Sequence, residues 1–155
     1  MLIKSIKVNG FKSYRNETVV GPFEKGFNVV VGRNGAGKSN FFSAIEFVLS
    51  DEYSNLSPQE RSSLLSQGTS GQRTLNAYVE IVFDNTSRRL GVNKDEISMR
   101  RTIGAKKDQY HLDGKVIPTR KELTGILESA GLFSRFSFFI VKQGKYNTTR
   151  LLLVT

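Results

Sequence analysis

The residues with the most specific chemistry lie between Gly32 and Ser39, where the chain reads GRNGAGKS. This matches the phosphate-binding pattern G-x-x-x-x-G-K-[ST]. Its glycines let backbone N–H groups approach phosphate oxygens closely, and Lys38 can reach the β- and γ-phosphates. Ser39 can offer its hydroxyl to Mg²⁺. The pattern predicts a site for ATP with Mg²⁺ made by Gly32, Arg33, Asn34, Gly35, Ala36, Gly37, Lys38 and Ser39. The alternative is a plain glycine-rich turn capped by Ser39, which would not need the lysine.

A phosphate loop of this kind must join a strand to a helix, and the sequence predicts both. Residues 27–31 (FNVVV) are β-branched and almost continuously apolar, which is typical of a strand buried on both faces. A helix is predicted from about Lys38 to Leu49. Phe41, Ile45 and Val48 share one face of it because they are spaced by four and three residues.

The other elements complete an α/β pattern of a mixed sheet with flanking helices. A hairpin is predicted around Asp113-Gly114, because Asp-Gly favours a type I′ turn. One helix should start at Pro58, and another should follow the N-cap Thr119, with Glu122 as its capping-box partner, and end at Gly131. Further strands are predicted over residues 3–11, 18–20, 77–83, 97–103, 108–112, 115–117 and 138–141.

Hydrolysis of ATP would need more than the loop, namely an apolar strand that ends in a catalytic acidic residue. The one candidate is residues 81–84 (IVFD). We reject it because residues 77–83 alternate as in a sheet with one wet face, and because Asp84-Asn85-Thr86 is typical of a turn. The chain is therefore expected to hold phosphates and to be inactive alone.

Composition narrows the classes of protein that the chain can belong to. It has 155 residues, no Cys and a single His, which excludes disulfides, thiolate metal sites and a His-based metal cluster. No apolar run reaches the roughly 18 residues that span a bilayer, so no membrane partner is expected. The net charge of +9 favours contact with DNA or with acidic protein faces. Alternatively, part of this charge serves one nucleotide and the rest is solvated.

Several motifs together resemble the N-terminal head segment of SMC (structural maintenance of chromosomes) ATPases. Some of them resemble one branch of that family, the third SMC subunit of eukaryotic cohesin. The resemblance covers about residues 1–146. Its motifs are residues 6–14 (IKVNGFKSY), 31–40 (VGRNGAGKSN), 47–52 (FVLSDE), 83–85 (FDN), 103–110 (IGAKKDQY) and 141–145 (VKQGK).

The resemblance implies the N-terminal lobe of an ABC-type, RecF-like P-loop head. In that family the acidic strand and the signature motif come from a C-terminal head lobe, and two heads from different SMC subunits enclose two ATP molecules. Gln143 would then be the Q-loop residue that helps to hold Mg²⁺ and the attacking water. The implied partners are that C-terminal lobe, a second SMC head, a kleisin subunit and DNA. The implied role is sister chromatid cohesion and chromosome organisation in the nucleus.

Further site residues also follow from the resemblance. Lys12, Ser13 and Tyr14 match positions where the family contacts the nucleotide from its opening strand, and Asn40 extends the loop motif. Lys106 and Lys107 match a lysine pair that is acetylated in the cohesin subunit. Acetylation would remove two positive charges and weaken attraction to phosphates.

Two stretches depart from the family pattern. The family often has Arg after the leucine at position 56, whereas this chain has Ser57, so a DNA or ATP contact there is in doubt. Residues 147–155 (NTTRLLLVT) do not resemble the continuation into a coiled coil, and we interpret them as a truncation or an alternative end. The alternatives to an SMC half-head are a catalytically silent basic fragment that binds DNA or a cohesin partner, and a small nucleotide kinase. A kinase would need a lid with further arginines, which the sequence does not show.

Overall fold

The computed structural model of the protein describes residues 2–67 and 74–131. A six-stranded sheet in the order β2-β1-β3-β4-β5-β6 forms one layer, and every neighbouring pair is antiparallel. Its strands are β1 Leu2–Asn9, β2 Thr18–Val20, β3 Asn76–Asp84, β4 Glu96–Gly104, β5 Asp108–Leu112 and β6 Lys115–Ile117. The helices are α1 Lys38–Leu49, the 3₁₀ turn η1 Asp51–Tyr53, α2 Pro58–Leu64 and α3 Arg120–Ser129.

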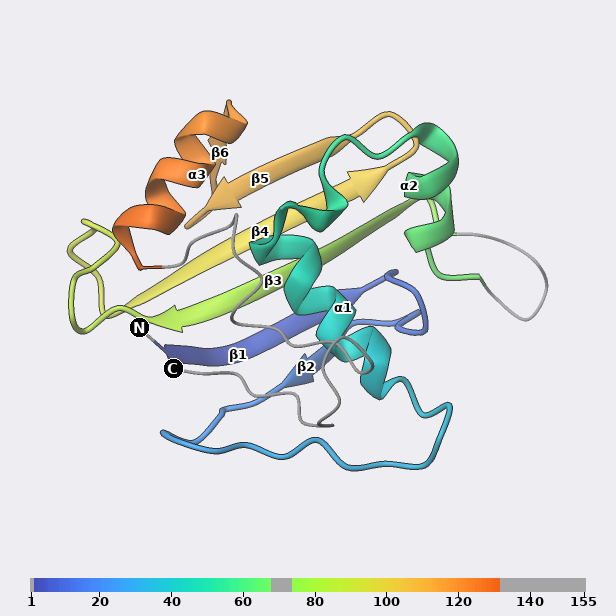
Figure 1. The fold of residues 1–155 in the computed structure, drawn as a ribbon, viewed down its shortest axis with the longest axis horizontal. Helices are drawn as coiled ribbons and strands as arrows, with labels where there is room; N and C mark the ends of the chain where they lie inside the picture. Colours follow the sequence, from blue (N-terminus) through green and yellow to red (C-terminus); the bar gives the residue numbers. More distant parts are fainter. Residues whose placement is uncertain (1, 68–73, 132–155) are drawn as a thin grey trace, which may run out of the picture.

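Helix α1 lies across one face of the sheet, over β1 and β3 (Figure 1). The predicted face of this helix is confirmed, since Phe41, Ile45 and Val48 are all buried. They pack in one cluster with alternate residues of the central strands, among them Ile6 and Ile81. The main core therefore lies between α1 and the sheet, because both elements present their apolar side there.

Most local predictions are confirmed. Asp113 and Gly114 have φ of 49° and 81°, as a type I′ turn requires. The Thr119 hydroxyl accepts a hydrogen bond from the Glu122 amide at 3.2 Å and so caps α3, and Gly131 ends it with a φ of 80°. Helix α2 begins at Pro58, as expected.

The prediction of a buried strand over residues 27–31 is wrong for this structure. The segment has no strand geometry, and Phe27, Val29 and Val31 are 88%, 82% and 83% exposed. A strand needs a neighbour for its backbone N–H and C=O groups, and no described residue pairs with this segment. The apolar pattern indicates that the segment could form a buried strand, but a strand also needs a neighbouring strand to pair with.

The opposite face of the sheet carries charged residues in one cross-strand row. Lys7, Glu80 and Arg100 are register partners on β1, β3 and β4. Glu80 accepts a hydrogen bond from Arg100 Nε at 2.8 Å and lies 3.5 Å from Lys7 Nζ. This pairing explains how a carboxylate can be almost fully buried on that face.

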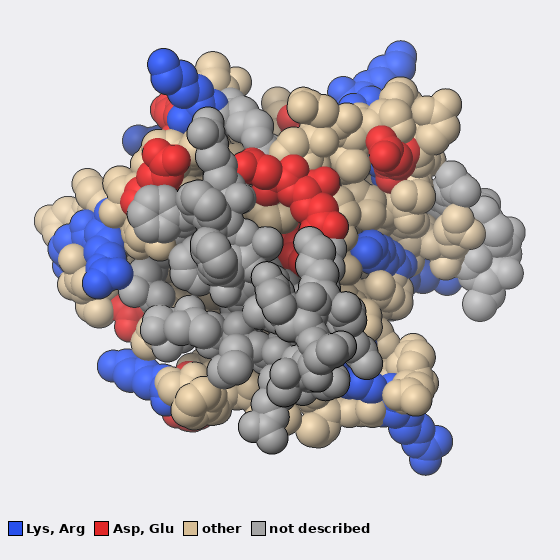
Figure 2. Space-filling model, viewed as in Figure 1, with Lys and Arg blue, Asp and Glu red and all other residues tan. Residues whose placement is uncertain are grey.

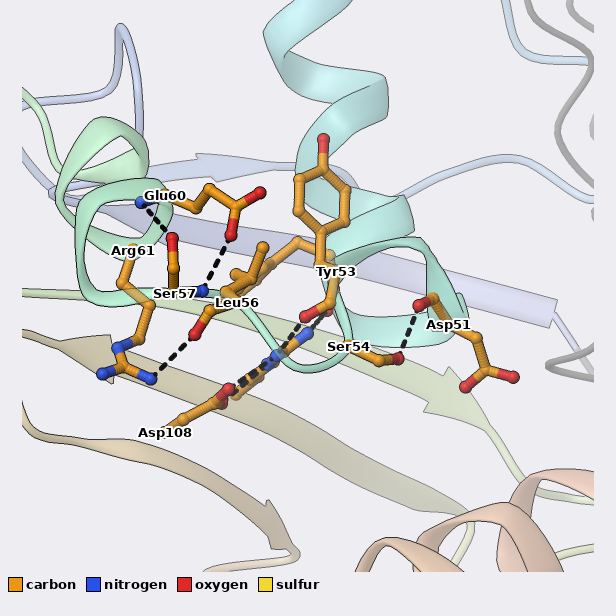
Figure 3. Close-up of polar contacts among 10 residues, drawn as sticks. Asp51, Tyr53, Ser54, Leu56, Ser57, Glu60, Arg61 and Asp108 are labelled. Atoms are coloured by element: carbon orange, nitrogen blue, oxygen red, sulfur yellow. Dashed lines mark hydrogen bonds and ion pairs between the residues drawn. The ribbon is translucent and has the colours of Figure 1, made fainter.

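One charged side chain, Arg101, lies on the core face of β4 and is only 1% exposed. Its Nε and one terminal nitrogen bind both oxygens of Asp108 at 2.8 and 2.7 Å. The guanidinium also donates to the carbonyls of Phe47, at 2.7 Å, and Tyr53, at 2.8 Å. Figure 3 shows Asp108 and Tyr53 meeting at this point between the sheet and the segment after α1. These four hydrogen bonds compensate the free-energy cost of burying the charge.

Several expectations fall outside the described residues. They are the strand at 138–141, the role of Gln143, the tail 147–155 and most of the loop at 67–71. Within the described ranges, no helix is long and apolar enough to cross a membrane.

We expect Arg101→Leu to lower the free energy of unfolding by about 3 kcal/mol, because it leaves the Phe47 and Tyr53 carbonyls without their donor and Asp108 without its counter-ion. Chemical denaturation followed by circular dichroism measures this loss. The control is Arg100→Leu on the opposite face, where Lys7 still neutralises Glu80. Equal losses for the two variants would contradict the anchoring role of Arg101.

Candidate nucleotide-binding site

The phosphate loop enters α1 through two glycines with left-handed backbone. Gly35 has a φ of 81° and Gly37 a φ of 90°, and Gly37 is the N-cap of α1 without any side-chain cap. Other residue types rarely adopt this backbone, so the motif's glycines are needed where they stand. Among the described residues no side chain caps the first amides of α1, so these amides can bind an anion, as the loop pattern predicts.

Lys38 folds back over its own loop. Its ammonium group donates to the carbonyl of Gly32 at 2.5 Å and to that of Arg33 at 2.8 Å. Two neutral carbonyls satisfy a cation less well than phosphate oxygens do, so a bound anion could take their place. The ammonium group therefore lies against the loop, beside the Gly32 and Arg33 carbonyls.

The residues present fit a phosphate with its metal ion. Ser39, in the first turn of α1, is exposed, and its hydroxyl makes no hydrogen bond within the described part of the chain. Arg33 and Asn34 are exposed on the same loop. When bound, Mg²⁺ would supply charge neutralisation for the phosphates, with Ser39 as its ligand from this loop.

The turn after β1 packs against the start of α1. Asn40 donates to the Ser13 hydroxyl at 3.0 Å, and the Tyr14 hydroxyl donates to the Gly37 carbonyl at 3.5 Å. A Cβ at Gly37 would approach Ser13 Oγ to 3.0 Å. Burial raises the pKa of Tyr14. The structure thus brings Ser13, Tyr14 and Asn40, all named from the family resemblance, to the loop.

Lys12 lies beside this turn but points elsewhere. Its ammonium is 3.5 Å from the Tyr53 hydroxyl and lies over the rings of Phe11 and Tyr53, at 5.7 and 5.8 Å from their centroids. Its φ of 48° places it in the left-handed region. In this structure Lys12 contacts aromatic rings and not the phosphate loop.

A small cavity of about 120 Å³ borders the loop. Its lining is mostly apolar, apart from Tyr14 and Lys38. The lining residues are Tyr14, Val20, Val30, Val31, Ala36, Lys38 and Phe41. The aliphatic stem of Lys38 therefore has an apolar wall beside it, while its ammonium group faces the loop carbonyls.

Asp84 does not lie where a catalytic acidic residue would. Its carboxylate accepts hydrogen bonds from the Thr86 amide at 2.9 Å and the Thr86 hydroxyl at 2.7 Å, and these bonds lower the pKa of Asp84. The carboxylate thus closes a turn at the end of an antiparallel strand. The rejection of residues 81–84 as a catalytic strand is in line with this geometry.

Lys106 and Lys107 are exposed in the turn between β4 and β5. The backbone amides of Gly104 and Lys107 donate to each other's carbonyls, at 2.8 and 3.4 Å, and close that turn. Arg61 of α2 donates to the neighbouring Ala105 carbonyl at 3.3 Å. The pair therefore stands at the tip of a hairpin, at the same end of the sheet as α2 (Figure 1).

Ser57 has a structural role that explains its presence. It is the N-cap of α2, and it exchanges hydrogen bonds with Glu60 in a complete capping box (Figure 3). These bonds lower the pKa of Glu60. Ser followed three residues later by Glu, with Pro between them at the first helical position, is the sequence signal for this box.

Arg101 was missed at the sequence level. Its signal was present, because it occupies an inward position in the alternation Ile97, Met99, Arg101, Ile103. A charged residue on a buried register must have partners, so this position predicts an internal ion pair.

Curated proteins similar to this chain are much longer than it is. A protein of Cryptococcus neoformans named urease accessory protein 2 is 56% identical over 145 residues, which are 94% of this chain and 12% of that protein. Structural maintenance of chromosomes protein 3 of Arabidopsis thaliana is 49% identical over 152 residues, 98% of this chain and 12% of that protein. The chain thus spans about 12% of the length of these relatives.

Two solved structures of SMC proteins align closely with this chain. An SMC head bound to the C-terminal winged-helix domain of ScpA aligns with a TM-score of 0.79 and 36% identity, over 93% of this chain and 45% of that one. A structure from work on ATP-driven dimerisation and DNA-stimulated activation of SMC ATPases aligns with a TM-score of 0.78 and 35% identity, over 93% of this chain and 87% of that one.

The model of the RecF/RecN/SMC N-terminal domain matches residues 2–135. That match covers the phosphate loop, α1 and the whole described sheet. Together with the relatives and the head structures, it shows that the chain belongs to the RecF/RecN/SMC family and has the fold of the N-terminal part of an SMC head.

Proposed function

We propose that this chain is the ATP-binding N-terminal lobe of a cohesin SMC subunit, acting in sister chromatid cohesion in the nucleus. The observation that carries the proposal is the loop itself, with left-handed Gly35 and Gly37 at the start of α1 and Lys38 already folded over it. The similarity to proteins named structural maintenance of chromosomes protein 3 supports the assignment to the third SMC subunit of cohesin. The loop residues Gly32 to Asn40, together with Ser13, bind the nucleotide, and Ser39 and Gln143 hold Mg²⁺.

The proposed site is half of a composite one. This chain offers amides, an ammonium and a hydroxyl, all of which bind phosphates or metal. The acidic residue of the one candidate catalytic strand, Asp84, instead closes a turn with Thr86. Cleavage of ATP then depends on a C-terminal head lobe and a second SMC head. A kleisin subunit is a further expected partner, by analogy with the ScpA-bound head.

Nucleotide binding should depend on Lys38. A charge-assisted hydrogen bond contributes roughly 1.5–3 kcal/mol, so Lys38→Ala should weaken ATP·Mg²⁺ binding by about tenfold to a hundredfold. Titration with a fluorescent ATP analogue measures this change. Lys115→Ala, on the edge strand β6, is the matched control and should bind like the unchanged chain. Equal affinity of both variants would remove Lys38 from the site.

Hydrolysis should appear only when the missing half is supplied. The chain alone is expected to release no phosphate above background, and co-expression with the C-terminal lobe of a cohesin SMC head, followed by addition of a second head, should restore turnover. A phosphate-release assay on the three preparations tests this. Turnover by the pure chain that Lys38→Ala abolishes would show that the site is complete.

A second role, contact with DNA, is favoured by the hairpin tip. Lys106 and Lys107 are exposed and make no ion pair among the described residues, whereas Lys4 and Lys94 pair with Glu96 and Asp113. Other Lys and Arg side chains lie mostly around the rim of the face seen in Figure 2 and do not form one patch there. We therefore assign the DNA contact to the hairpin tip in particular.

Replacing Lys106 and Lys107 by Gln, which mimics acetylation, should weaken DNA binding and lower the slope of log K against log salt by about 1 per lysine. Fluorescence anisotropy at several salt concentrations measures the slope. The control replaces Lys4 and Lys94 by Gln, which changes the net charge equally but removes lysines that are already paired. Identical slopes for the two double variants would exclude the hairpin tip from the phosphate contacts.

A further inference from the structure

The dipeptide Asn-Gly occurs twice in the chain, at Asn9-Gly10 and Asn34-Gly35. In this dipeptide the glycine nitrogen can attack the asparagine side chain with little hindrance, because glycine has no Cβ. The two copies share this chemistry but have very different surroundings. The structure therefore distinguishes between them where the sequence does not.

The Asn-Gly dipeptide in the phosphate loop is exposed to solvent and sterically unhindered. Asn34 and Gly35 are exposed in a turn that the Ala36 amide closes by donating to the Arg33 carbonyl at 3.1 Å. A Cβ added at Gly35 would meet nothing within 4 Å. The Asn34 side chain makes no hydrogen bond within the described residues. Its amide carbon can therefore swing towards the Gly35 nitrogen without breaking any interaction.

The Asn-Gly dipeptide at the end of β1 is tightly packed. Asn9 pairs with Tyr78 in the sheet, and Gly10 is buried. A Cβ at Gly10 would lie 2.7 Å from the Asn76 carbonyl oxygen, and the Gly10 carbonyl accepts a hydrogen bond from the Ser66 amide at 2.6 Å. Attack at Asn9 would first require this part of the sheet to open, which costs free energy.

We propose that Asn34 is a site of spontaneous deamidation within the phosphate loop. The Gly35 backbone nitrogen gives its proton to hydroxide and attacks the Asn34 side-chain carbonyl carbon. The side-chain nitrogen takes a proton from water, which regenerates hydroxide, and leaves as ammonia, so that a five-membered imide remains. Water then adds to one of the two imide carbonyls and opens the ring. The products are aspartate at position 34 or an isoaspartyl link, in which the backbone runs through the former side chain.

The electrostatics of the loop favour this reaction. The attacking nitrogen and the intermediate that it forms are anionic, and Arg33 and Lys38 place positive charge on the same loop. The positive charges that suit the loop to phosphate thus also stabilise the anionic intermediate of deamidation. At Gly10, by contrast, the atoms nearest to an added Cβ belong to the uncharged residues Asn76, Ala77 and Thr74.

The product would lose phosphate affinity, because it adds a carboxylate where phosphate is expected to bind. Conversely, a bound phosphate would hold the Gly35 amide as a hydrogen-bond donor and block its attack. This last step rests on the proposed nucleotide binding. An empty loop is then open to modification and a loaded loop is protected from it.

The test is to age the purified 155-residue chain at mildly alkaline pH, with and without ATP·Mg²⁺, and to follow the peptides that contain Asn9 and Asn34 by mass spectrometry and isoaspartyl methyltransferase labelling. Without nucleotide, Asn34 should convert at least about tenfold faster than Asn9, a ratio that needs only about 1.4 kcal/mol of opening free energy at Asn9. In urea the two rates should converge. The variant Asn34→Gln should lose the modification at 34 and keep the slow one at Asn9.

Equal rates at the two sites in buffer would overturn the proposal, whatever the chain binds. Faster conversion at Asn34 that ATP·Mg²⁺ fails to slow would support the modification site and contradict the proposed nucleotide binding. Faster conversion that nucleotide suppresses would support both.

Discussion

The arrangement of the molecule depends on how one buried positive charge is satisfied. The guanidinium of Arg101 sits in the core of β4, where an unpaired charge would cost several kcal/mol. It is stable there because Asp108 and the carbonyls of Phe47 and Tyr53 surround it. Phe47 belongs to the last turn of α1, so this charge fixes the end of the helix that lies opposite the phosphate loop.

The same contact joins the two regions to which we assign function. Asp108 directly follows Lys107, so the ion pair also fixes the base of the hairpin that carries the exposed lysines. Arg61 holds the tip of that hairpin from the side of α2. The hairpin and the phosphate loop are therefore both attached to elements that pack in one core, with α1 between them, and are not independent surface features.

The sequence was sufficient wherever a local rule decides the structure. The spacing of Phe41, Ile45 and Val48 defined the buried face of α1, and Asp113-Gly114 defined the hairpin turn. The prediction from sequence failed where the structure of a segment depends on a partner that is distant in the chain. Residues 27–31 have the composition of a buried strand, yet nothing in the described sheet pairs with them. The inward position of Arg101 in an alternating strand predicts that it has buried partners, but the sequence does not show that Phe47, Tyr53 and Asp108 are those partners.

The exposed strand-like segment bears directly on the loop that follows it. The phosphate loop is attached on one side to α1, which is packed in the core, and on the other side to residues 27–31, which are largely exposed. If Phe27, Val29 and Val31 packed against another sheet, each Å² of apolar surface removed from water would stabilise the packed state by about 25 cal/mol. It would also order the loop before phosphate arrives, so that less conformational entropy is lost on binding. In the proposed site, the loop's glycines and lysine would supply the chemistry of phosphate binding, and pairing of the segment before the loop would increase the affinity.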